Sequence, residues 1–166
     1  LPFQDEDGRT YYRNNGQNTH RGIEIGLNYA LGSTSAFQMA YTGSDFVFSD
    51  TQLNTTVLSG SKLNGNRIPG IPVHHLQAAL SSMRSGFTGE LSVEFVSDMY
   101  SDNENDTSND GYVVLDLNMG YASLRVQDVQ VWPFLNISNL LDAEYIGSMV
   151  INAFGGRYFE PSPGRS

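Results

Sequence analysis

Hydrophobic and polar residues alternate along most of this chain with a period of two, and helical periodicity is nearly absent. Such alternation is typical of β-strands, whose successive side chains point to opposite faces of a sheet. It predicts an all-β fold, an antiparallel up-and-down meander of about six or seven strands. The six complete strands are expected at Gly22–Leu31, Phe37–Thr42, Leu76–Ser81, Phe87–Phe95, Val113–Tyr121 and Val129–Leu140, with part of a seventh at Thr10–Asn14.

The connections between these strands alternate between short and long. Short turns are expected near residues 32–35, 84–86 and 124–128, and long polar connections near 14–18, 48–72, 101–110 and 144–164. Transmembrane barrels carry tight turns at one end of the sheet and long loops at the other. Strands of about ten residues also suit a tilted membrane span. The pattern therefore favours part of a transmembrane β-barrel.

The polar face of the expected strands carries carboxylates and amides. They are Glu24, Glu90, Glu94, Asp116 and Asn118. Burying such groups in a packed core would cost free energy, whereas a watery lumen or bulk solvent would hydrate them. A soluble antiparallel sandwich with one face of each sheet in water fits the same alternation, so the pattern leaves both architectures open.

Composition removes several classes of function. The formal net charge of −9 argues against nucleic-acid binding, which needs a basic surface. The absence of cysteine excludes thiolate metal sites and thiol nucleophiles. Glu90 and Glu94 lie about 13 Å apart along one strand, too far to act together on one glycosidic bond. No catalytic motif is present, so we expect no enzymatic activity and no cofactor.

Two loop segments contain groups that could contact a ligand or a metal. Arg67 and His74 flank a proline-containing stretch that is more readily explained as a rigid return from loop to strand. The acidic run Asp98–Asp110 resembles a calcium loop but lacks the glycine and glutamate that such loops require at their sixth and twelfth positions. We expect a solvated loop and no metal there; the side chains that would bind one are Asp102, Glu104, Asp106 and Asp110.

Arg157 and Arg165 flank a Tyr-Phe-Glu-Pro-Ser-Pro segment. They could contact an anionic ligand from a loop, but pairing with nearby carboxylates at a loop-to-strand junction is the favoured interpretation. The sequence does not specify the ligand-binding residues. Arg67, His74 and Arg157 are the loop side chains that would serve as candidates.

Four segments resemble motifs of TonB-dependent outer-membrane receptors and occur in the order found in that family. Leu141 stands where the family usually has phenylalanine, and both residues are apolar. The resemblance covers nearly the whole chain. Its segments are Asn14–Glu24, Gly65–His74, Asn139–Tyr145 and Gly156–Arg165.

The resemblance implies a barrel of about 22 strands filled by an N-terminal plug domain. Such a receptor lies in the outer membrane of a Gram-negative bacterium and imports a scarce nutrient, most often a ferric siderophore, using energy delivered through TonB. Residues 1–166 would be a single-domain fragment of that barrel, without the plug and the last strand, which should begin near Gly164. The implied partners are the rest of the barrel and plug, TonB through the plug, and outer-membrane lipid.

A fragment of this kind is expected to be inactive in transport by itself. Closed membrane barrels begin at about eight strands. Fewer strands leave two open edges, whose unpaired backbone groups lipid cannot satisfy. The isolated chain would then pair edge to edge with its own copies. Two alternatives remain: a soluble or self-associating β-sheet module with a binding or structural role, and a small outer-membrane barrel completed by two copies.

Overall fold

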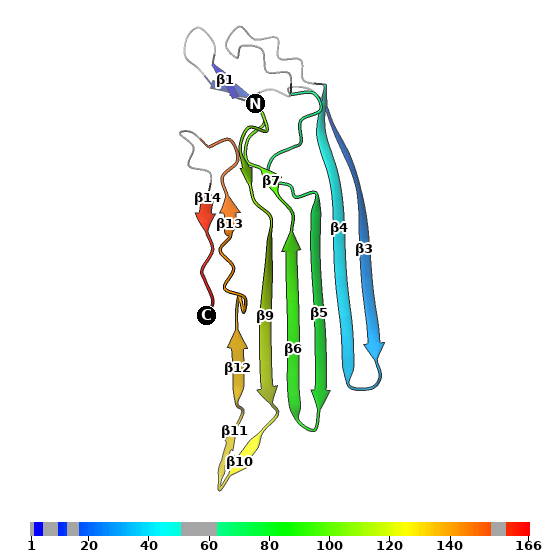
Figure 1. Ribbon diagram of the computed structural model, residues 1–166, viewed down its shortest axis with the longest axis vertical. Helices are drawn as coiled ribbons and strands as arrows, with labels where there is room; N and C mark the ends of the chain where they lie inside the picture. Colours follow the sequence, from blue (N-terminus) through cyan, green and yellow to red (C-terminus); the bar gives the residue numbers. More distant parts are fainter. Residues whose placement is uncertain (1, 5–9, 13–16, 51–62, 154–158) are drawn as a thin grey trace.

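The computed structural model describes residues 2–4, 10–12, 17–50, 63–153 and 159–166. Its main element is a six-stranded antiparallel sheet with the strand order β12-β9-β6-β5-β4-β3 (Figure 1). Each strand of this sheet pairs with the sheet strands that come before and after it in the sequence. This order confirms the predicted all-β meander. The strands are β3 (Gln17–Leu31), β4 (Ser35–Asp50), β5 (His74–Arg84), β6 (Phe87–Val96), β9 (Tyr112–Tyr121) and β12 (Phe134–Ile137).

Tight turns join the strands at one end of the sheet. Ser85 and Gly86 form a two-residue connection between β5 and β6, with φ angles of 52° and 85°. Positive φ at both positions defines a turn whose twist matches that of the flanking strands. Gly32, with φ of 75°, opens the turn between β3 and β4. The short turns expected near residues 32–35 and 84–86 are therefore present.

Four two-stranded antiparallel ribbons accompany the main sheet. Two of them extend connections at the long-loop end, and the hairpin between β9 and β12 extends the opposite end (Figure 1). The ribbons are β1 (Pro2–Gln4) with β2 (Thr10–Tyr12), β7 (Met99–Tyr100) with β8 (Ser108–Asn109), β10 (Leu124–Val126) with β11 (Val129–Val131), and β13 (Ile146–Met149) with β14 (Phe159–Pro161).

Three predictions from the sequence, two of strands and one of a turn, differ from the structure. The partial strand expected at Thr10–Asn14 does not join the main sheet, because β2 pairs with β1 instead; Asn14 lies outside the described residues. The strand expected at Val129–Leu140 is divided into β11 and β12. Pro133 lies at the division and has no N–H to donate to a ladder. The turn expected near residues 124–128 is part of the β10–β11 ribbon.

The sheet is a single layer without a packed core. Among the described residues, only Leu63, Val96 and Val114 are buried hydrophobic side chains. Most large apolar side chains of the strands are exposed, and Figure 1 shows no second layer over the main sheet. The described residues are therefore not arranged as a sandwich, in which two sheets bury their apolar faces against each other.

The described part of the chain contains no helix that is long and apolar enough to cross a membrane.

Candidate functional site

The two faces of the main sheet differ sharply in chemistry. Directly opposed residues of antiparallel strands share a face, so the strand register assigns each strand side chain to one of the two faces. One face, called the outer face, is apolar; its central row is Tyr29, Phe37, Leu80, Leu91, Leu117 and Ile137. The other, called the inner face, is polar; its central row is Asn28, Gln38, Ala79, Ser92 and Asp116.

The inner face carries carboxylates but no lysine or arginine in the described residues of its strands. Glu24, Glu90, Glu94 and Asp116 all lie on this face by register. No group of three or more His, Asp or Glu side chains in the described ranges is placed to hold a metal ion. The inner face is therefore an acidic, hydrogen-bonding wall, and it is the candidate functional surface of the chain.

Glu94 is the centre of a polar cluster on this wall. Its Oε1 lies 2.8 Å from His75 Nε2 and accepts a hydrogen bond of 3.1 Å from Gln77 Nε2. The His75 and Glu94 side chains are each 38% exposed, so the pair is open to a ligand or to water. Above the cluster, the Tyr112 ring packs against Tyr145 with centroids 4.4 Å apart.

A pocket of about 420 Å³ lies beside this cluster, under the long loops. Its lining includes His75, Glu94 and Tyr112 from the main sheet, Gly70 from the loop after β4, and Ile146 from β13. Polar side chains and loop backbone thus meet at the long-loop end of the wall. Such an arrangement can orient a polar ligand through hydrogen bonds, without any group placed for covalent chemistry.

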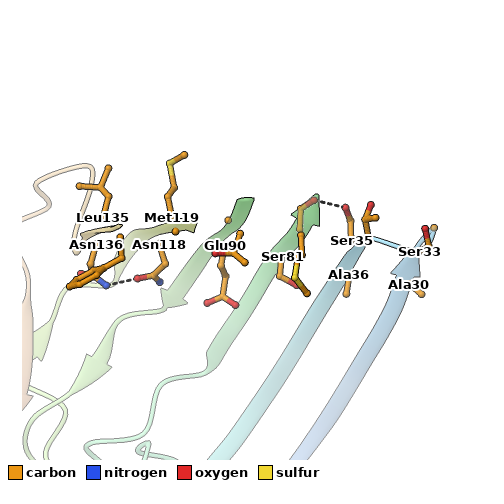
Figure 2. Close-up of a pocket in the computed structure, with 18 residues that line it drawn as sticks. Ala30, Ser33, Ser35, Ala36, Ser81, Glu90, Asn118, Met119, Leu135 and Asn136 are labelled. Carbon is orange, nitrogen blue, oxygen red and sulfur yellow. Dashed lines mark hydrogen bonds between the residues drawn. The ribbon is translucent and has the colours of Figure 1, made fainter. Parts of the chain in front are cut away.

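A second, larger groove lies at the short-turn end of the same wall. It has a volume of about 930 Å³, and Ser81 and Glu90 are among the residues that line it. Figure 2 shows Glu90, Asn118 and Asn136 on the side of the sheet opposite Met119 and Leu135. Asn136 donates a hydrogen bond to Asn118 across the strands. The polar character of the wall therefore continues along its length.

The loop candidates expected from sequence do not lie on this wall. Arg67 bridges Val47, which places it on the outer face by register. His74 opposes Gly43, also on the outer face, and its Nδ1 lies 2.9 Å from Tyr41 Oη. Arg157 lies outside the described residues. His75, and not His74, is the histidine on the inner face, where it shares a side of β5 with Gln77. The alternation of side chains along a strand could have identified it from the sequence.

The acidic run has an internal role in the structure. Both carboxylate oxygens of Asp102 accept backbone hydrogen bonds of 2.9 Å, from Asp106 N and Thr107 N, and close the loop. Asp102 is buried, whereas Glu104, Asp106 and Asp110 are exposed. Closure of a loop on its own aspartate is a common turn motif. These two hydrogen bonds account for the closure of the loop.

Asparagine side chains join three loops at the long-loop end, a contact that sequence reasoning missed. Asn105 Oδ1 accepts a hydrogen bond of 2.7 Å from Arg67 N, and Asn105 Nδ2 donates one of 2.9 Å to Arg67 O. Asn66 Nδ2 donates to Asn103 O, and Asn152 Oδ1 accepts from Asn103 N. The loops that follow β4, β6 and β12 are therefore held to one another.

The Asn139–Tyr145 motif forms a closed turn. Asn139 is 3% exposed; its Oδ1 accepts from Ala143 N and its Nδ2 donates to Ala143 O, both at 2.9 Å. The Arg165 guanidinium lies 3.6 Å from Asp142 Oδ2, and the Arg165 backbone N donates to Asp142 Oδ1 at 3.0 Å, so this arginine pairs with a nearby carboxylate. Ser138 and Ser166 exchange two backbone hydrogen bonds, so the chain pairs again beside β12.

An antiparallel meander that is apolar outside and polar inside, with tight turns at one end and long loops at the other, defines a sector of a barrel wall of the outer-membrane type. A family model for the β-barrel of TonB-dependent receptor-like proteins matches residues 2–140, and this chain belongs to that family. Members of the family are outer-membrane proteins of Gram-negative bacteria. The family and the structural neighbours are receptors and transporters, not enzymes.

Solved structures of similar fold include three receptors. The siderophore receptor PiuA from Acinetobacter baumannii matches with a TM-score of 0.76 and 22% identity over 99% of this chain and 22% of its own. The ferric yersiniabactin uptake receptor FyuA from Yersinia pestis matches with a TM-score of 0.71 and 20% identity over 92% and 23%. The ferric preacinetobactin receptor BauA from Acinetobacter baumannii gives 0.70 and 21% over 99% and 24%.

This chain thus spans less than a quarter of the length of each of these receptors.

Proposed function

We propose that this chain forms one sector of the barrel wall of an outer-membrane receptor that takes up a ferric siderophore with energy delivered through TonB. The observation that carries the proposal is the inversion of polarity between the two faces of the sheet. A wall with lipid outside and water inside needs this inversion. The three solved neighbours are named as a siderophore receptor, a ferric yersiniabactin uptake receptor and a ferric preacinetobactin receptor, and these names support the ligand class.

The proposal assigns partners to each surface of the sector. The outer face contacts outer-membrane lipid. The inner face, with Glu94 and His75, lines the lumen and contacts the plug and the passing ligand. The edges at β3 and β12 pair with further strands of the barrel, because open edges are not tolerated in lipid. TonB acts through the plug.

By itself the sector does not transport. Its main sheet has six strands and two edges, fewer than the roughly eight strands from which closed membrane barrels begin. It can line a pathway but cannot enclose one.

Uptake of radioactive iron tests both the assignment as a barrel sector and the ligand class. Bacterial cells without receptors of their own would express either this chain alone or a receptor that contains it as a barrel sector, with and without TonB. We expect iron uptake from a ferric siderophore only with the receptor and TonB together. Uptake by the chain alone would contradict the sector proposal. A receptor that ignores ferric siderophores but imports another nutrient would contradict the ligand class.

One observation favours a second role outside the membrane. The 15-residue strand β3 pairs only with β4 among the described residues and so presents a long free edge. Free edges template the pairing of further chains. If the chain were a self-associating soluble module, light scattering would detect oligomers in buffer without detergent. A requirement for detergent or lipid supports the barrel sector instead.

A further inference from the structure

We propose that Arg21 and Arg67 bind a phosphate monoester on the headgroup of a lipid, at the long-loop edge of the outer face. The inference rests on the proposed function, because it requires the outer face to contact lipid. It goes further by naming the lipid chemistry that this part of the wall recognises and the side chains that recognise it.

Charged side chains are divided between the two faces of the main sheet. The arginines lie on the outer face: Arg21 and Arg84 by strand register, and Arg67 by its bridge to Val47. Asp45, which opposes Arg21, is the one carboxylate on this face among the described side chains of the main sheet. The outer face is therefore apolar in its middle and carries arginines toward its ends, although the whole chain has a formal net charge of −9.

The apolar rows of the outer face between His74 and Arg84 form a band with the height of a membrane-spanning wall. At the long-loop edge, His74 Nδ1 lies 2.9 Å from Tyr41 Oη. At the short-turn edge, Arg84 opposes Phe87, whose ring packs edge to face on Tyr121. From His74 to Arg84, the 11 residues of β5 extend about 33 Å, which a strand tilt of about 40° reduces to about 25 Å along the membrane normal. This value equals the height of the apolar band in outer-membrane barrels.

Arg21 and Arg67 lie just beyond the long-loop edge of this band. Along β4, the partner of Arg21 is two residues past the partner of His74, and the partner of Arg67 is four residues past it. Two to four residues of a tilted strand cover about 5–10 Å along the membrane normal. The headgroup layer is roughly 5–8 Å thick on each side of the hydrocarbon core. Both arginines therefore lie at the depth of lipid phosphates.

The backbone of Arg67 is firmly held, although it belongs to a loop. Its two neighbours in the chain form hydrogen bonds with the backbone of β4, and the Asn105 amide bonds to both Arg67 N and Arg67 O. Among the described residues, neither the Arg67 nor the Arg21 guanidinium takes part in an ion pair. The structure thus fixes Arg67 on the lipid side of the sheet and leaves its charge open to an anion.

Two guanidinium groups on either side of β4 suit a phosphate monoester. Two strand spacings, about 10 Å, separate the backbones of Arg21 and Arg67 across the sheet. Each guanidinium presents a planar fork of N–H donors that matches phosphate oxygens. A phosphate monoester carries close to two negative charges and three acceptor oxygens, so it can accept hydrogen bonds from both arginines, whereas a phosphodiester carries a single charge.

Asp45 provides a test in the opposite direction. It is exposed and opposes Arg21 on the outer face, so its carboxylate lowers the positive charge that the site offers to an anion. Removal of this carboxylate should strengthen the binding of a phosphate, whereas removal of Arg21 should weaken it. Misfolding of a variant cannot produce such a gain.

The experiment uses a receptor that contains this chain as a barrel sector, purified in an uncharged detergent. Native mass spectrometry measures its apparent affinity for dioleoyl phosphatidic acid, whose headgroup is a phosphate monoester. We expect Arg21→Gln and Arg67→Gln each to weaken the affinity about tenfold, the loss of one charge-assisted hydrogen bond. Arg67→Lys keeps the charge without the fork and should lose less. Asp45→Asn should strengthen the affinity about twofold.

Arg125→Gln is the matched control, because it removes the same charge from the β10–β11 ribbon, and it should leave the affinity unchanged. A loss equal to that of Arg21→Gln would mean that net charge alone governs binding, and would refute the site. Equal affinity for phosphatidylglycerol, a phosphodiester, would refute the monoester. Binding of inorganic phosphate as tight as that of phosphatidic acid would refute a lipid as the occupant.

Iron uptake by cells that express the same variants separates this inference from the proposed function. If the receptor imports iron but the arginine variants bind phosphatidic acid as the unaltered receptor does, the lipid site is refuted and the barrel sector stands. If lipid binding depends on the arginines but no ferric siderophore is imported, the lipid site stands and the ligand class is refuted. A receptor that is recovered without detergent and binds no lipid would refute both.

Discussion

The outer and inner faces of the main sheet satisfy their side chains in different ways. On the outer face, Ile23 and Leu91 are 57% and 40% exposed. These side chains can stabilise the sheet only by contact with an apolar environment around it. On the inner face and in the loops, polar groups bond to one another, as Glu94 does with His75. The outer face should therefore tolerate changes in side-chain shape but not the introduction of a charge. The stability of the inner face and the loops depends instead on individual hydrogen bonds. Substitutions can test this distinction.

The largest effect is expected from a charge on the outer face. Leu91 and Ser92 are neighbours on β6 and point to opposite faces. In lipid, Leu91→Arg should destabilise the folded state by about 2–4 kcal/mol, the cost of a cation near the middle of a barrel wall. Ser92→Arg, beside Asp116 in the register, should change stability by no more than about 0.5 kcal/mol. Urea unfolding of a receptor that contains this sector, inserted in vesicles, measures both, and equal effects would contradict the assignment of faces.

A smaller effect is expected where one amide closes a turn. Asn139→Ala removes both hydrogen bonds to the Ala143 backbone and places alanine at a φ of 52°. The loss should be about 1–3 kcal/mol, because two partly buried backbone groups of Ala143 lose their hydrogen bonds. Leu141→Ala, at a side chain 61% exposed in the same turn, is the control and should have little effect. A neutral Asn139→Ala would show that the turn does not depend on this amide.

The smallest effect is expected in the asparagine contacts between loops. Asn105→Ala removes the two part-buried hydrogen bonds to the Arg67 backbone, worth about 0.5 kcal/mol each. The loss should be local, so hydrogen exchange at the Arg67 amide should accelerate while exchange in β5 and β6 stays the same. Asp106→Ala changes an exposed side chain of the same loop and should not alter exchange at Arg67. Unchanged exchange in Asn105→Ala would mean that the loops are held by other contacts.

The alternation of residues was sufficient to predict the central strands, since period-two patterning follows directly from strand geometry. It underestimated their ends. β3 starts at Gln17 in a run of polar residues, and β4 continues to Asp50 through the consecutive apolar residues 46–48. Hydrophobic alternation fades at both ends, although the backbone ladder continues. Ladder hydrogen bonds are independent of side-chain polarity, so hydrophobic patterning could not locate these ends.

The loop contacts could not be predicted from the sequence. Asn105 and Arg67 are 38 positions apart, and Asn103 and Asn152 are 49 apart. An asparagine amide can bond to almost any backbone, so its partner is set by the three-dimensional path of the loops. The division of the strand expected at Val129–Leu140 was missed but could have been predicted, because Pro133 cannot donate to a ladder.

The meander topology has a consequence for how such a wall is assembled. Every strand of the main sheet pairs with the main-sheet strands that precede and follow it in the sequence. No pairing therefore has to wait for a strand from elsewhere in the sequence. Closing a short loop costs little entropy, and local pairings form early. The wall can therefore grow one hairpin at a time from either edge, and the gain or loss of a hairpin would leave the register of the remaining strands unchanged.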